Sequence, residues 1–90
     1  MLETKIETAL RKGVEARGGL CLKWTCPNRR GVPDRIVFTP SNRIIFIETK
    51  APDGRLKSWQ RRQHALLRNY GCSVTALNNL DDVAYFLAGL

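Results

Sequence analysis

Two short runs of the sequence carry side chains that suit chemistry at a phosphodiester bond: Gly31-Val32-Pro33-Asp34 and Glu48-Thr49-Lys50. Carboxylate oxygens bind hard cations such as Mg²⁺ or Mn²⁺, and a bound cation can shield charge on a scissile phosphate. Residues 48 and 50 point to the same side of a strand, so Lys50 can reach an attacking water or a phosphate while the Thr49 side chain turns away. We therefore expect Asp34 and Glu48 to be metal ligands, with the Thr49 carbonyl completing the shell.

A hairpin is expected to bring these two runs together. Residues 35–39 and 44–47 are β-branched and aromatic runs, and Pro40-Ser41-Asn42-Arg43 between them is a turn sequence. In an antiparallel hairpin the start of the first strand lies beside the end of the second. Asp34 and Glu48 are therefore predicted to be neighbours.

A first helix supplies a further acid. Leu2, Ile6, Leu10 and Val14 recur every four residues before Gly18-Gly19, which predicts an amphipathic helix ending at the glycines. Two glutamates share one flank of this helix, and either can complete a cluster of three carboxylates. The sequence leaves the choice between Glu3 and Glu7 open.

The remaining elements complete an α/β fold. Residues 20–24 and 72–77 are predicted strands, and residues 25–33 a loop. A helix capped by Ser58 is expected to end at Gly71, and Asn79 starts a last short helix. The order α-β-β-β-α-β-α predicts one mixed sheet flanked by helices, with the strand order undetermined. In the second helix the partly buried residues are expected to be Trp59, Leu66, Leu67 and Tyr70.

The length of the chain favours one domain, residues 1–90, and its charge favours a polyanionic partner. Fifteen Lys and Arg against eight Asp and Glu give a formal net charge of +7, which favours nucleic acid through phosphate contacts and counterion release. Three cysteines without a CxxC pair support neither a disulfide framework nor a zinc site, and Cys21 and Cys72 are expected to be buried. No secretory signal or membrane span is evident, so we expect a cytoplasmic protein. The side chains expected to contact DNA phosphates are Arg29, Arg30, Arg35, Arg55, Lys57, Arg61 and Arg62.

The joint pattern resembles the PD-(D/E)XK (restriction-endonuclease-like) nucleases, through Pro33-Asp34 and Glu48-Thr49-Lys50. More narrowly, the chain resembles the stand-alone form of the VRR-NUC (virus-type replication-repair nuclease) family from the first helix to Asp82. The runs that carry this resemblance are Gly31-Val-Pro-Asp-Arg35, Phe46-Ile-Glu-Thr-Lys-Ala-Pro52, Gly54-Arg-Leu56, Gln60 and Leu67-Arg-Asn-Tyr-Gly71.

The resemblance implies a Mg²⁺- or Mn²⁺-dependent phosphodiesterase in which Asp34 and Glu48 bind metal and Lys50 assists the nucleophile. It also implies that Gln60 lies beside the site and that a helix-one glutamate completes it, with Glu7 favoured over Glu3. The stand-alone members resemble dimeric resolvases of four-way (Holliday) junctions, so a homodimer acting on branched DNA in a bacterial or phage-infected cell is expected. His64, four residues after Gln60, is a minor candidate whose default interpretation is a surface residue.

Three alternatives remain at this point. The enzyme could cut flaps or nicks instead of junctions, or the chain could be a non-catalytic DNA-binding module that keeps only the basic surface. A structural protein of a ribosome or virion would also carry this charge. Cleavage of labelled DNA with an EDTA control separates these alternatives.

Overall fold

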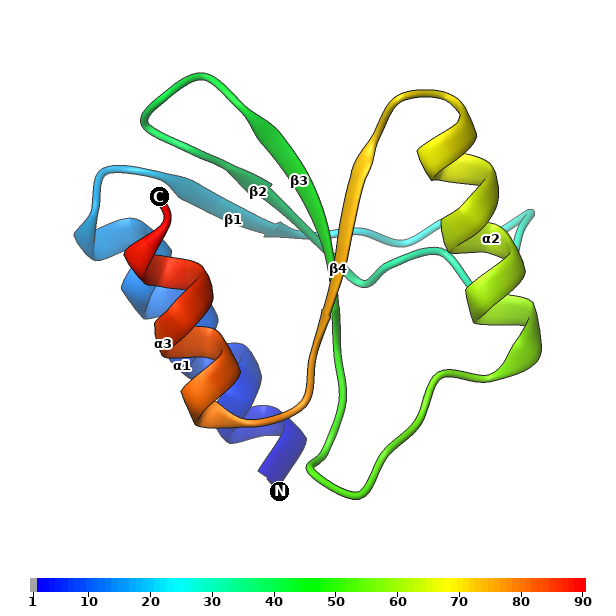
Figure 1. The fold of residues 1–90 in the computed structure, drawn as a ribbon, viewed down its shortest axis with the longest axis horizontal. Coiled ribbons are helices and arrows are strands. Elements are labelled where there is room, and N and C mark those ends of the chain that lie inside the picture. The colour runs from blue at the N-terminus through cyan, green and yellow to red at the C-terminus, as the bar shows by residue number, and fades with distance from the viewer. Residues whose placement is uncertain (1) are drawn as a thin grey trace.

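A computed structural model describes residues 2–90, with side chains from residue 3 onward, so the predicted packing of Leu2 lies outside the described side chains. The chain forms a four-stranded mixed sheet with helices on both faces (Figure 1), which confirms the predicted fold class and element order. The elements are α1 (Leu2–Ala16), β1 (Leu20–Lys23), β2 (Arg35–Phe38), β3 (Ile44–Thr49), α2 (Ser58–Asn69), β4 (Ser73–Leu77) and α3 (Leu80–Ala88).

The sheet has the strand order β1-β2-β3-β4. β1, β2 and β3 are antiparallel neighbours, and β4 runs parallel to β3. A parallel pair requires a crossover connection, and α2 provides it. The tight turn between β2 and β3 contains Asn42 at a φ of 66°, a left-handed conformation that asparagine tolerates well.

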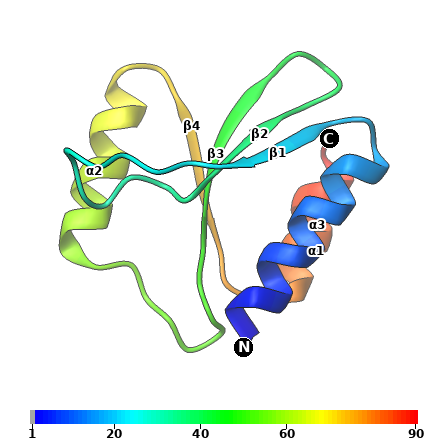
Figure 2. The ribbon, with the colours of Figure 1, turned by 180° about the vertical axis from the view of Figure 1, so that it is seen from behind.

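The main core lies between α1, α3 and one face of the sheet. From α1, Ile6, Leu10 and Val14 are at most 2% exposed, as the four-residue spacing predicts. They pack with inward residues of the strands and of α3, namely Val37, Ile45, Ile47, Leu77, Val83 and Leu87. Figure 2 shows α1 and α3 side by side on this face, with α2 on the opposite side of the sheet.

The second helix differs from expectation in its burial. Ser58 is its first helical residue and Lys57 the N-cap, so the predicted Ser58 cap is wrong. Tyr70 is 80% exposed and Leu66 is 37% exposed, whereas His64, expected at the surface, is 1% exposed. The physical reason is the orientation of α2 about its own axis. The helix turns its His64 face toward the protein, which leaves Leu66 and Tyr70 on the solvent side.

None of the described helices combines the length and the apolar character needed to cross a bilayer.

Candidate active site

The start of β2 and the end of β3 meet as the hairpin predicts. Arg35 pairs with Ile47 in the antiparallel register, which places Asp34 and Glu48 next to each other across the two strands. Asp34 is fixed there by Thr49. Its Oδ1 accepts the Thr49 backbone N–H (3.2 Å) and its Oδ2 accepts the Thr49 hydroxyl (3.0 Å). Both oxygens of the carboxylate are thus oriented by one fully buried residue.

The N-terminal half of α1 adds two acids to Asp34. Glu3, Glu7 and Asp34 each offer a carboxylate oxygen, and these oxygens lie within 4.8 Å of one another. Glu3 and Glu7 are one helical turn apart and face the same side, so the structure brings both candidates to the site and leaves the choice between them open. Three hard oxygen donors at this spacing fit a divalent cation such as Mg²⁺ or Mn²⁺.

Glu7 also pairs with Arg35, whose Nη2 donates to Glu7 Oε2. Strand alternation places Arg35 on the sheet face that α1 covers, and its side chain is only 15% exposed. Arg35 is predicted from the sequence to contact phosphate, and this ion pair with Glu7 is an additional contact. The signal was present, because the residue after Asp34 must point toward the first helix if Val37 is part of the core.

The Glu48 carboxylate is turned toward two other partners. Gln60 Nε2 donates to Glu48 Oε2 (3.3 Å), and Lys50 Nζ lies 3.7 Å from the same oxygen. Gln60 itself is oriented by its other end, since its Oε1 accepts the Lys57 backbone N–H (2.8 Å) in the first turn of α2. The amide therefore presents its NH₂ group to Glu48.

Burial governs the charge state of this carboxylate. Glu48 is 5% exposed, and burial, followed by the repulsion of Asp34, raises the pKa of Glu48 to about 7. The nearby Lys50 ammonium opposes this rise. A carboxyl group with a pKa near 7 holds or releases its proton readily at neutral pH, and a bound cation would favour the released form.

Close packing holds the Gly31–Asp34 loop against α2. Gly31 has a φ of +90°, and a Cβ at this position would lie 2.8 Å from the Trp59 carbonyl oxygen. Only glycine combines this left-handed conformation with such a close approach. The guanidinium of Arg30 then stacks over the Trp59 ring at 4.1 Å.

His64 is buried without a hydrogen-bond partner for either ring nitrogen. Burial, followed by the Arg68 charge, lowers its pKa. The four-residue spacing from Gln60 was the sequence signal for this placement, because residues four apart share a helix face.

The basic side chains assigned to DNA contact, Arg35 apart, gather around the first turn of α2. Arg29 and Arg30 extend from the loop before the motif, and all six of these side chains are exposed. The other four lie in the loop after Lys50 or in the first turns of α2: Arg55, Lys57, Arg61 and Arg62. Of these, Arg55 and Arg61 line the same surface cavity as Lys50 and make it cationic.

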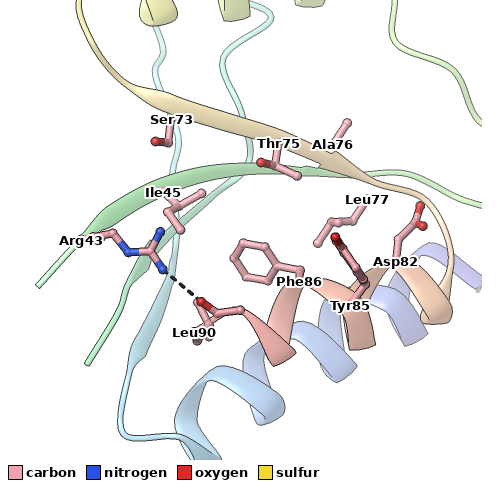
Figure 3. Close-up of a pocket in the computed structure, with 11 residues that line it drawn as sticks. Arg43, Ile45, Ser73, Thr75, Ala76, Leu77, Asp82, Tyr85, Phe86 and Leu90 are labelled. Atoms are coloured by element: carbon pink, nitrogen blue, oxygen red, sulfur yellow. Dashed lines mark hydrogen bonds between the residues drawn. The ribbon is translucent and has the colours of Figure 1, made fainter. Parts of the chain in front are cut away.

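A separate cavity of about 570 Å³ lies between β4 and α3, away from the carboxylates (Figure 3). Arg43 crosses one end of it and donates to the Gly89 carbonyl (3.2 Å). Tyr85 and Phe86 line its α3 side. None of the sequence-predicted site residues contributes to this cavity, so the candidate site is the carboxylate cluster.

Comparison with known proteins decides the family of this chain. The family model described as VRR-NUC domain matches residues 3–79. The chain belongs to the VRR-NUC family. The matched range contains every acid of the cluster, Lys50 and Gln60.

Two relatives agree with this assignment. The chain is 43% identical over 79 residues to "Putative nuclease p44" of Acyrthosiphon pisum secondary endosymbiont phage 1, and the match covers 88% of this chain and 85% of that protein. A solved structure described as a VRR_NUC domain is similar with a TM-score of 0.90 and 27% identity. That match covers 98% of this chain and 96% of the other. The fold and the nuclease class predicted from the sequence are both confirmed.

Proposed function

We propose that this VRR-NUC nuclease is a Mg²⁺- or Mn²⁺-dependent DNA endonuclease. The observation that carries the proposal is the convergence of three carboxylates, from Glu3, Glu7 and Asp34, beside the Glu48–Lys50 pair. When bound, the cation would supply charge stabilisation at the scissile phosphate and lower the pKa of water. Cation binding is assigned to Asp34, Glu48, the Thr49 carbonyl and the helix-one glutamates.

The protein's own groups have separate roles in this proposal. Thr49 fixes both oxygens of Asp34, so the carboxylate is oriented before substrate arrives. Lys50 places its ammonium group where it can hold the attacking water or a phosphate oxygen. Gln60 keeps the Glu48 carboxylate directed toward Lys50. Arg35 offsets part of the negative charge that Glu7 adds to the cluster.

We further propose branched DNA as the preferred substrate, in replication, repair or recombination within the cytoplasm of a bacterial or phage-infected cell. Recognition would rely on phosphate contacts and DNA shape, since contacts to phosphate position a protein without reading bases. The exposed cations around α2 support this mode. Labelled four-way junctions, flaps, nicked duplexes and plain duplexes incubated with Mg²⁺ or Mn²⁺, with EDTA controls, test it.

The expected result is metal-dependent cleavage that is fastest on the four-way junction. Faster cleavage of flaps or nicks would keep the nuclease and reject the junction preference. DNA binding without cleavage in any metal would favour the non-catalytic alternative. Lys50→Ala should abolish cleavage, whereas Lys12→Ala, an exposed change in the second half of α1, is the matched control for loss of one positive charge.

A homodimer is part of the same proposal, and exposed apolar side chains on the α2 side of the sheet support it, because α2 packs mainly against β4 at one edge. The face opposite α1 carries two rows of apolar side chains across three strands: Leu20, Phe38 and Ile44, then Leu22, Ile36 and Phe46. Leu20, Leu22 and Ile44 are 47%, 45% and 54% exposed. Antiparallel sheets that face water usually carry polar residues on the face away from the core, whereas these two rows are entirely apolar.

A second copy suits this face because its two rows carry no charged side chain in a chain of formal charge +7. Two copies can pack here without bringing like charges together. Leu22→Glu is expected to convert a dimer to a monomer in sedimentation while the circular dichroism spectrum stays native. A wild-type monomer at high concentration, or a dimeric Leu22→Glu variant, would contradict this part of the proposal.

A further inference from the structure

A second cavity lies directly beside the candidate site, and three of its lining side chains are cations. Its volume is about 330 Å³, and its lining includes Lys50, Arg55, Arg61 and Asn78. No Asp or Glu contributes to this lining. Lys50 connects the cavity to the site, because its Nζ also lies 3.7 Å from Glu48 Oε2. The cavity thus borders the place where the scissile phosphate is proposed to bind.

The Arg61 side chain and the backbone next to Arg55 are held at the cavity by the surrounding chain. Arg61 Nη1 donates to the Leu56 carbonyl (3.0 Å), and this hydrogen bond ties α2 to the end of the loop that precedes it. A guanidinium has five N–H donors, so the remaining ones stay available to a ligand. The loop is also tightly packed, since a Cβ on Gly54 would lie 3.3 Å from Lys50 Cβ. The position of Arg55 relative to Lys50 is therefore constrained by a short, close-packed segment.

Neither arginine is neutralised within the part of the chain that the structure describes. The salt bridges found among residues 3–90 involve Arg11, Arg35 and Lys50, and none involves Arg55 or Arg61. Three cations and an amide around a cavity with no acid in its lining favour an anion with several acceptor oxygens. Guanidinium groups bind phosphate oxygens in this way, with strong charge-assisted hydrogen bonds.

We propose that this cavity binds one backbone phosphate of the cleaved strand, the neighbour of the scissile phosphate. The inference rests on the proposed nuclease function and adds to it a fixed contact that holds the strand in register. Because Lys50 borders both the site and the cavity, two successive phosphates of one strand can occupy them. Asn78 contributes an amide at the β4 side of the cavity.

Single-position methylphosphonate substitution tests the proposal, because it removes the charge of one phosphate and leaves the others intact. Wild-type protein is expected to lose about tenfold or more in cleavage rate when one phosphate adjacent to the scissile bond is neutralised. Arg55→Ala and Arg61→Ala should each be slower on unmodified DNA and lose most of this positional penalty. Both side chains are exposed, so the variants should keep wild-type melting temperatures.

Arg62→Ala is the matched control. Arg62 is an exposed arginine one position after Arg61 on α2, and it does not line the cavity. This variant should weaken DNA affinity at all positions and keep the full penalty at the single sensitive phosphate. A small, uniform penalty across all positions in wild type, or an unchanged positional penalty in both Arg55→Ala and Arg61→Ala, would overturn the proposal.

The test remains decisive if the proposed nuclease function fails. Arginine binds phosphate without metal, so equilibrium binding of the same methylphosphonate series can be measured in EDTA. Loss of affinity at one position, absent in Arg55→Ala, supports the cavity as a phosphate site. Affinity that is insensitive to every single substitution rejects it, whatever the outcome of the cleavage assay.

Discussion

Replacing Glu48 with glutamine should stabilise the metal-free protein at alkaline pH. Glu48 is 5% exposed, and its pKa is raised from 4.5 to about 7 by burial and by Asp34. The native state therefore binds this proton more tightly than the unfolded state does, and the free energy of unfolding falls as pH rises from 4.5 to 7. The shift corresponds to a loss of about 3 kcal/mol at pH 8.

Glu48→Gln removes the charge and keeps an oxygen that can accept from Gln60. The variant is therefore expected to match wild type near pH 4 and to be more stable by about 3 kcal/mol at pH 8 in EDTA. For a chain of this size that difference raises the melting temperature by roughly 10 °C or more. Thermal and urea unfolding at both pH values measure it.

Added Mg²⁺ should reverse the comparison. A cation that binds only the native state of wild type raises its stability by about 2.7 kcal/mol at a hundred times the dissociation constant. Glu48→Gln should gain much less, and wild type should gain less at pH 5.5, where the proton competes with the cation. Equal stability of the two proteins at pH 8 in EDTA would refute the assignment of a buried carboxylate with a raised pKa.

Three further substitutions probe the supports of the site. Gly31→Ala should lower the melting temperature and the activity together, because at a φ of +90° its Cβ would lie 2.8 Å from the Trp59 carbonyl oxygen. A variant with the melting temperature of wild type would contradict this close contact. Thr49→Val keeps the side-chain shape but removes the hydroxyl that donates a hydrogen bond to Asp34, so we expect about tenfold weaker Mg²⁺ binding in calorimetry. Unchanged affinity would show that the Thr49 backbone N–H alone is enough to orient Asp34. His64→Leu should be at least as stable as wild type at pH 7 and more stable at pH 5. The lowered pKa of His64 means that wild type loses stability as pH falls below about 6.5, and a parallel pH profile for both proteins would exclude this explanation.

Local sequence patterns were sufficient to predict the hairpin and its consequence. The turn at residues 40–43 and the apolar runs around it set the register that places Asp34 beside Glu48. The shared position of Glu3 and Glu7 on one side of α1 is predictable from the spacing of Ile6, Leu10 and Val14. These buried residues determine which side of the helix faces the core and therefore where its polar flank lies. Each of these features depends on residues close together in the chain.

Tertiary packing decides the features that local sequence patterns do not predict. The strand order, the rotation of α2 that buries His64, and the hydroxyl bond from Thr49 to Asp34 all depend on contacts between distant segments. The apolar run of β3 is typical of a strand covered on both faces, yet Ile44 is 54% exposed. Periodicity cannot distinguish a face covered by the same chain from one available to a second copy.

The single-turnover cleavage rate of a labelled four-way junction in Mg²⁺ tests the central claim most directly. Wild type and Lys12→Ala are expected to cut at similar rates that EDTA abolishes. Asp34→Asn and Lys50→Ala are expected to bind the junction and leave it intact. Cleavage by either of these two variants at the wild-type rate, or wild-type cleavage that persists in EDTA, would contradict the assignment of this site.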